Sequence, residues 1–176
     1  MINILKKDLY RYNEKSKIKL LSKKEIKWLI YFRKLQYCNN KFLKIIYYFK
    51  YKKMTSITGI QIPVRTKIGE GFYIGHCGRI IINPNSVLGR NINIATGVTI
   101  GQENRGKRKG TPIIGDNVWI GTNAVIVGNI KIGNDVLIAP LSYVNFDVPN
   151  HSIVIGNPGK IIKKEQATKD YINNVI

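Results

Sequence analysis

The sequence predicts a mainly β protein, a parallel β-helix of hexapeptide repeats preceded by a short helical segment. The first observation is a period of six: between Ile62 and Val144 every sixth residue is aliphatic, apart from two interruptions. The second observation is that the residue four places after the aliphatic one tends to be small or apolar. A period of six fits neither an α-helix, whose period is 3.6, nor a simple strand, whose period is 2. Short strands that coil around a continuous aliphatic core repeat in this way.

Eleven of the thirteen residues in the aliphatic series are Ile, which rules out chance. The residue after each of them is often Gly or Ala, and we expect glycine there to supply the backbone freedom that the corners need. The repeats divide the chain into a helical segment at 1–57, a repeat domain at 58–164 and a tail at 165–176 that is helical or frayed. The series comprises Ile62, Ile68, Ile74, Ile82, Leu88, Ile94, Ile100, Ile114, Ile120, Ile126, Ile132, Ile138 and Val144.

Length and composition favour one domain inside the cell. A chain of 176 residues has room for a sizeable core. Two cysteines are too few for a disulfide framework, which favours a reducing compartment. The N-terminus has no apolar run long enough for a signal peptide, and the longest apolar stretches are too short to span a bilayer. We therefore expect a cytoplasmic protein.

The net charge of +19 is concentrated in residues 1–57, which carry 16 Lys and Arg against 3 Asp and Glu. Apolar residues recur here at spacings of three and four, which predicts two or three short helices with a break at 38–40. One interpretation is a basic cap that packs on the coil or on a sister subunit. The other is a surface that contacts anionic lipid at the inner face of the membrane, or an acidic glycan. No recognition motif accompanies the charge, so we do not expect nucleic acid as a partner.

Two irregularities interrupt the repeat, and functional residues favour such places on a rigid scaffold. Between Ile74 and Ile82 eight residues replace six, which predicts a bulge that carries His76 out of the coil. Between Gly101 and Ile113 a polar, basic loop leaves the coil. In a three-sided coil the two excursions leave from different corners, so a site that uses both is easiest to build between subunits. This arrangement predicts a closed homotrimer.

Residues 114–164, the bulge GHCG at 75–78 and the repeats that follow it resemble the left-handed β-helix acyltransferases. The bulge and the loop spacing are similar to the serine acetyltransferase branch. Within that branch the chain most resembles bacterial capsule and exopolysaccharide O-acetyltransferases of the colanic acid type. The resemblance covers about 58–164 and implies a left-handed coil, a homotrimer with sites between subunits, and acetyl-CoA as the donor.

The resemblance also implies roles for single residues. His76 matches the family's general base, and Gln61 stands where serine acetyltransferases have the aspartate that orients this histidine. A backbone carbonyl is the alternative partner for the imidazole. The backbone N–H of Gly101 is expected to stabilise the oxyanion. Trp119 flanks the CoA groove or packs between subunits, and the other residues expected to contact CoA are Thr122, Pro140, Asn157, Lys160 and Lys163.

Departures from the serine acetyltransferase pattern bear on the acceptor. Gly75, Gly110 and Thr111 stand where that branch has the residues that hold the amino and carboxylate groups of serine. We therefore expect the acceptor to be a sugar hydroxyl of a surface polysaccharide, its glycolipid unit or its precursor. The alternatives are serine O-acetylation for cysteine synthesis and N-acetylation of a nucleotide sugar.

Two further classes are disfavoured. A metal-dependent hydratase with this coil needs three histidine ligands, and the chain has two histidines, so we expect no metal. A non-enzymatic binding protein would leave the histidine bulge unexplained. We expect His151, at the end of the coil, to be structural. Cys77 is expected to be a small turn residue, because direct transfer from CoA needs no acyl-enzyme.

Overall fold

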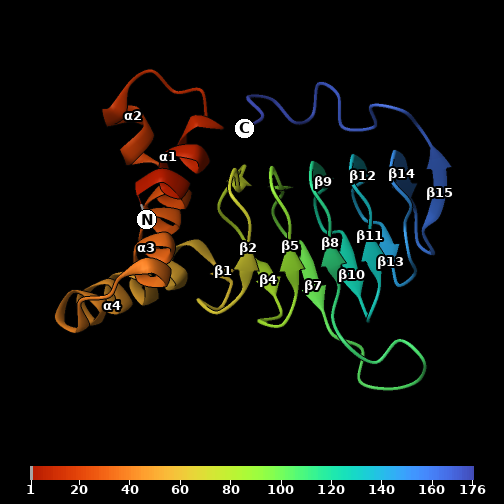
Figure 1. The fold of residues 1–176 in the computed structure, drawn as a ribbon, viewed down its shortest axis with the longest axis horizontal. Helices are drawn as coiled ribbons and strands as arrows, with labels where there is room; N and C mark the ends of the chain where they lie inside the picture. The colour runs from red at the N-terminus through yellow and green to blue at the C-terminus, as the bar shows by residue number, and fades with distance from the viewer. Residues whose placement is uncertain (1) are drawn as a thin grey trace.

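The computed structural model describes residues 2–176, except for the side chains of Ile2 and Lys17. A group of helices comes first and a three-sided coil of strands follows it (Figure 1). The described helices number four, more than predicted, and the expected break at 38–40 falls between α3 and α4. The helices are α1 (Ile2–Tyr10), α2 (Lys17–Ser22), α3 (Lys24–Tyr37) and α4 (Lys41–Thr58).

The strands form three sheets, one for each side of a prism. The first face contains β1 (Ile60–Gln61), β4 (Ile80–Ile82), β7 (Thr99–Gly101), β10 (Val125–Val127) and β13 (Tyr143–Val144). The second face contains β2 (Lys67–Ile68), β5 (Val87–Leu88), β8 (Ile113–Ile114) and β11 (Lys131–Ile132). The third face contains β3 (Tyr73–Ile74), β6 (Asn93–Ile94), β9 (Val118–Ile120), β12 (Val136–Ile138), β14 (Ser152–Ile155) and β15 (Lys160–Lys163). Strand β15 is antiparallel to β14, and the other pairings are parallel.

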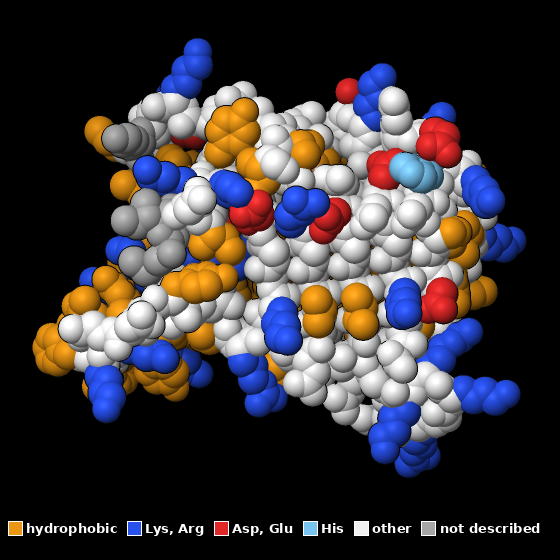
Figure 2. Space-filling model, in the orientation of Figure 1, with side chains coloured by type: hydrophobic (Ala, Val, Ile, Leu, Met, Phe, Trp, Pro, Cys, Tyr) orange, Lys and Arg blue, Asp and Glu red, His pale blue; other side chains and the backbone are white. Residues whose placement is uncertain are grey.

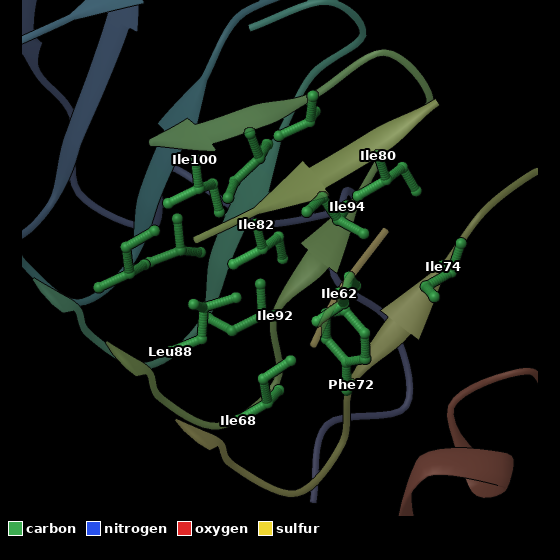
Figure 3. Close-up of a cluster of buried hydrophobic side chains, with 14 of the residues drawn as sticks. Ile62, Ile68, Phe72, Ile74, Ile80, Ile82, Leu88, Ile92, Ile94 and Ile100 are labelled. Carbon is green, nitrogen blue, oxygen red and sulfur yellow. The ribbon is translucent and has the colours of Figure 1, made fainter. Parts of the chain in front are cut away.

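The predicted aliphatic series forms the core of the coil. All of its members are buried, and none is more than 7% exposed. Equivalent residues stack from turn to turn, because Ile82 pairs with Ile100, which pairs with Ile126. Figure 3 shows these side chains pointing into the prism from all three faces. The residues four places later, such as Thr66 and Ser86, are also fully buried. The period of six is therefore confirmed as the repeat of a β-helix.

The glycines after the aliphatic residues do a different job from the predicted one. None of them has a φ angle in the left-handed region. A Cβ on Gly69 would lie 2.5 Å from the carbonyl oxygen of Gly89, and a Cβ on Gly89 would lie 2.5 Å from that of Gly115. The left-handed conformation comes two residues later, at Asn91 and Asn117, each with a φ of 54°. At Gly69, Gly89 and Gly115, close approach of successive coils, not corner geometry, requires glycine after the aliphatic residue.

A buried ion pair joins the helices to the first coil. Arg33 Nε donates to Asp8 Oδ2 at 2.7 Å, and both side chains are fully buried. Asp8 Oδ1 accepts the N–H of Phe72 at 2.9 Å, and Arg33 also donates to the carbonyls of Ile68 and Gly69 at 2.9 and 2.6 Å. Burial raises the pKa of Asp8, and Arg33 offsets part of that rise. The pair fixes α1 and α3 on the first turn of the coil.

Helix α4 leaves an apolar strip uncovered at the helical end of the molecule (Figure 2). Phe42, Ile45 and Phe49 are all more than half exposed. The helix contains five lysines and no acidic residue. Contact of this surface with anionic lipid or an acidic glycan stays a prediction. Among the helices of residues 2–176, none is long and apolar enough to cross a membrane.

The C-terminal tail is neither helical nor frayed, so that prediction was wrong. After β15 the chain turns back and runs along the third face to α1 (Figure 1). Asp135 Oδ1 accepts the N–H and the hydroxyl of Thr168 at 2.9 and 2.6 Å, and Asp135 Oδ2 contacts His151 Nδ1 at 2.8 Å. At the other end, Arg11 Nε donates to the carbonyl of Asn173 at 2.8 Å. The contacts of Thr168 and Asn173 hold the tail against the coil.

Replacing Arg33 by Met should lower the free energy of unfolding by about 3–5 kcal/mol, because it leaves a buried carboxylate without its partner. The double variant Asp8→Asn, Arg33→Met should recover much of this loss, since no unpaired charge remains. Urea unfolding followed by circular dichroism measures both. A single variant within about 1 kcal/mol of the parent would show that the pair does not anchor the helices.

Candidate active site

His76 lies in the predicted bulge, at the edge of the prism between the third and first faces. Strand β3 ends at Ile74 and β4 begins at Ile80, so the chain leaves the coil between them. The side chain of His76 is exposed. Among the hydrogen bonds of the described residues, none involves its imidazole. The ring is therefore accessible to a substrate, and its tautomer is not fixed from within the chain.

His76 lines a cavity of about 510 Å³ between the end of α1, the third face and the tail. The end of α1 contributes Arg11, the third face contributes Tyr73 and Trp119, and the tail contributes Tyr171. The rings of Trp119 and Tyr171 meet edge to face, with centroids 5.0 Å apart. The tail therefore forms one wall of the cavity that contains the histidine.

Tyr12 fixes the strand that leads to His76. Its hydroxyl donates to the carbonyl of Ile74 at 3.1 Å and accepts the N–H of Ile74 at 3.0 Å. Its ring lies 4.5 Å from the ring of Tyr73. Burial raises the pKa of Tyr12 well above its ordinary value, so the phenol stays protonated. Tyr12 is built to position the end of β3, not to accept a proton.

Four of the predicted site residues lie along one edge of the prism. His76 follows β3, Thr122 follows β9, Pro140 follows β12 and Asn157 follows β14. These strands lie in the order β3, β6, β9, β12, β14, so the four residues span about 19 Å at the usual strand spacing. Thr122 and Trp119 line the His76 cavity, and Trp119 and Pro140 line a second cavity of about 790 Å³ under the tail. His76, Trp119 and Thr122 therefore line one cavity, and Trp119 also lines the neighbouring cavity that contains Pro140.

Lys160 and Lys163 lie on β15, at the end of the coil away from β3, and both are exposed. The turn before them is held by the N–H of Gly159, which donates to the carbonyl of Tyr143 at 3.0 Å. The lysines are thus close in sequence and in the fold to Asn157, and far from His76. Contact of these three residues with CoA stays a prediction.

Gln61 and Gly101 lie on the first face, away from the His76 cavity. Both line a separate cavity of about 980 Å³ between α4 and the first face. Gln61 forms no hydrogen bond with His76 within the chain, because Gln61 lies in β1 on the first face and His76 lies in the bulge after β3. The predicted pairing is not seen within one chain, and a pairing between subunits stays a prediction.

Cys77 adjoins His76 but is not built as a nucleophile. Its Sγ donates to Glu25 Oε2 at 3.2 Å. Burial, together with Glu25, raises the pKa of the Cys77 thiol to about 11. Because the thiolate is the reactive form, this cysteine is unreactive at neutral pH. The described residues also hold no group of three or more His, Cys, Asp or Glu side chains placed for a metal ion.

Gly75 and Gly110 differ in the side chains that they would admit. A Cβ on Gly75 would meet only the ring of Tyr73, at 3.7 Å. Gly110 has a φ of 138°, and a Cβ there would lie 2.9 Å from the Cβ of Asn129. Position 75 has room for a side chain, whereas position 110 does not in this loop conformation. The loop projects from the coil (Figure 1), and its basic residues are exposed.

Sequence reasoning missed the half of the cavity that comes from the two ends of the chain. Residues 1–57 were interpreted as a cap or as a surface for anionic lipid or an acidic glycan, and 165–176 as a tail, so neither was expected to line the site. One signal was available: Arg11 and Arg33 are the two arginines among 16 basic residues of the helical segment. Both are buried, which suits the rigid, multidentate guanidinium better than a lysine.

Comparison with known proteins places this geometry in a family. Residues 111–145 match the family "Bacterial transferase hexapeptide (six repeats)". The structure of Neisseria gonorrhoeae serine acetyltransferase in complex with serine is similar over 92% of this chain and 68% of that one, with 32% identity and a TM-score of 0.75. The chain belongs to the hexapeptide-repeat acyltransferases. The predicted left-handed parallel β-helix with N-terminal helices is thereby confirmed.

Further relatives carry the same name. Serine acetyltransferase 2 of Arabidopsis thaliana is 34% identical over 134 residues, 70% of this chain and 42% of the relative. Serine acetyltransferase of Staphylococcus aureus (strain Mu50) is 41% identical over 108 residues, 61% of this chain and 51% of the relative. The chain thus spans about half the length of the curated relatives it matches. These relatives support the serine acetyltransferase branch, and they do not support the expected placement closest to capsule O-acetyltransferases.

Proposed function

We propose that the chain is an acetyl-CoA-dependent O-acetyltransferase in which His76 is the general base. The main support is that His76 is exposed and lines a cavity of this chain. Structures of relatives similar to this chain were solved in complex with serine and with coenzyme A. The Brucella abortus serine acetyltransferase in complex with coenzyme A has a TM-score of 0.78 and 25% identity to this chain.

His76 would serve a direct transfer. The imidazole takes the proton of the acceptor hydroxyl as its oxygen attacks the thioester carbonyl. The new C–O bond forms, the C–S bond breaks, and the CoA sulfur leaves with the proton that the imidazole returns. The protonated Cys77 takes no part. The donor would run along the edge from Thr122 to Asn157.

The remaining groups of this mechanism come from a neighbouring subunit in the proposal. Gly101 supplies an N–H for the oxyanion, and Gln61 orients the imidazole. Both lie on the first face, whereas His76 leaves from the edge with the third face. A cyclic trimer can bring these surfaces together.

The protein should therefore be a trimer in solution, with three times the chain mass of 20.0 kDa. Light scattering at micromolar concentration measures this mass. Gln61→Ala should lower the transfer rate without unfolding the chain, since the side chain is exposed on a single chain. A monomeric parent would remove the proposed roles of Gln61 and Gly101.

His76→Ala should lower kcat by about 10²–10⁴-fold, the usual contribution of a general base. The melting temperature should not change, because the exposed His76 takes no part in the core. Release of free thiol from acetyl-CoA measures the rate. His151→Ala is the matched control and should keep most of the activity, since His151 contacts Asp135 at the end of the coil and does not line the His76 cavity. Near-parent turnover in a folded His76→Ala protein would reject His76 as the base.

The relatives make L-serine the first candidate acceptor, since the Neisseria gonorrhoeae relative was solved in complex with serine. A sugar hydroxyl of a polysaccharide or its precursor is the second candidate, and three observations favour it. The loop has no room for a side chain at Gly110, and the hydroxyl of Thr111 is already bound to the carbonyl of Asn85 at 3.1 Å. The cavity volume of about 510 Å³ also lies in the range that accepts ligands larger than an amino acid.

Gly75→Asp should raise kcat/KM for L-serine about tenfold or more. The position admits a side chain, and one charge-assisted hydrogen bond to the amino group is worth about 1.5–3 kcal/mol. Gly110→Arg is the control and should not raise kcat/KM for L-serine, because a side chain is strained at the φ angle of 138° at this position. Steady-state kinetics with L-serine and a glycan panel measures both variants. If the parent already prefers L-serine to every glycan, the sugar candidate fails.

A further inference from the structure

Arg11 is a buried cation that lacks an anionic partner. It is 4% exposed and lines the cavity that contains His76. The ion pairs of the described residues do not include it. Its partners are oxygens of neutral groups: the carbonyl of Gly71 at 2.7 Å, Asn93 Oδ1 at 2.6 Å and the carbonyl of Asn173 at 2.8 Å.

This state of Arg11 is costly for the folded protein, because a buried charge needs a counter-charge. Burial lowers the pKa of Arg11, as expected for a cation removed from water. Asp8 does not serve as its ion-pair partner, since its oxygens bind Arg33 and the N–H of Phe72. A guanidinium has five N–H groups, so the three bonds leave one N–H free on each terminal nitrogen.

The cavity around Arg11 suits an anion. No Asp or Glu is among its described lining residues, whereas Arg11 and His76 are. The aromatic rings of Tyr73 and Trp119 form part of its wall, and the guanidinium carbon of Arg11 lies 5.9 Å from the centre of the Tyr73 ring. Asn174 adds an amide from the tail. A ligand with a carboxylate would meet a cation that has two unused N–H groups, in a wall without an Asp or Glu among its described residues.

We propose that Arg11 binds a carboxylate of the acceptor, while the acceptor hydroxyl faces His76. The proposal rests on the proposed acetyl transfer and names its acceptor class, a hydroxylated carboxylic acid. Charge-assisted bonds from a guanidinium to a carboxylate are the strong kind, and they orient the ligand as well as bind it. An amino acid such as L-serine and an acidic sugar such as a uronic acid both have this chemistry.

Matched pairs of acceptors test the proposal on the intact parent protein. The pairs are L-serine with L-serinamide, and D-glucuronate with D-glucose, each assayed with acetyl-CoA. In the productive pair the acid should have a kcat/KM at least about tenfold above that of its neutral partner, a ratio that corresponds to about 1.4 kcal/mol. Acetylation of L-serine would identify an amino acid as the acceptor, and acetylation of D-glucuronate would identify an acidic sugar. Equal kcat/KM values within that pair overturn the proposal.

Arg11→Gln separates binding from structure, since Arg11 also ties the tail to the coil. Loss of the carboxylate site should bring the acid-to-neutral ratio close to one. Loss of structure alone would lower kcat/KM for the acid and for its neutral partner by the same factor. The ratio would then stay unchanged, and this result would overturn the proposal. Thr168→Ala is the matched control: it loosens the other end of the tail at Asp135, outside the cavity, and should keep the ratio.

If no acceptor is acetylated, the proposed acetyl transfer is rejected, but the carboxylate site is not. Ligand binding then tests the carboxylate site. Trp119 lines the cavity, so its fluorescence reports the ligand, with Trp119→Phe as the control for the buried Trp28. Glucuronate or serine should bind, and the neutral partner should bind at least about tenfold more weakly. If Arg11→Gln does not fold, the Nε–H resonance of Arg11 in parent protein labelled with ¹⁵N-arginine replaces it. That resonance should shift with the acid and not with its neutral partner, and no shift overturns the proposal.

Discussion

Close stacking of successive coils is the constraint on which the rest of this structure depends. Ile82, Ile100 and Ile126 follow one another in register, and glycines such as Gly89 allow one coil to approach the next within a distance that a Cβ would prevent. Because the register is fixed, residues at equivalent hexad positions line up along an edge. The alignment of His76 with Thr122 at their edge is a consequence of core packing.

The sequence predicted those parts of the molecule that repeat. A side chain that recurs every six residues is buried for the same reason each time, so the core, the three faces and the His76 bulge followed from the pattern. The wall of the cavity did not, because Arg11 meets Asn173 across 162 residues of sequence. Neither residue belongs to the hexapeptide repeats, and no local sequence pattern predicts their contact.

The errors have physical reasons as well. Glycine was assigned to corners because its backbone freedom is the usual reason for it, whereas Asn91 takes the left-handed conformation and glycine is needed for proximity. The tail looked frayed because its polar residues have no period, yet Asp135 binds it from the coil. The relatives support the predicted serine acetyltransferase branch but not the placement beside capsule O-acetyltransferases within it. That finer placement depended on Gly75, Gly110 and Thr111, which lie outside the repeats that encode the packing.

The tail that runs from β15 back to Arg11 sets the permitted length of the coil. A solenoid ordinarily gains or loses a repeat with little penalty, since each repeat touches only its neighbours. Here an extra turn would lengthen the third face by about 4.8 Å and draw Asn173 away from Arg11. A lost turn would leave slack in the same segment. The number of turns and the length of the tail must therefore vary together, so this repeat protein has a fixed size that its repeats alone do not specify.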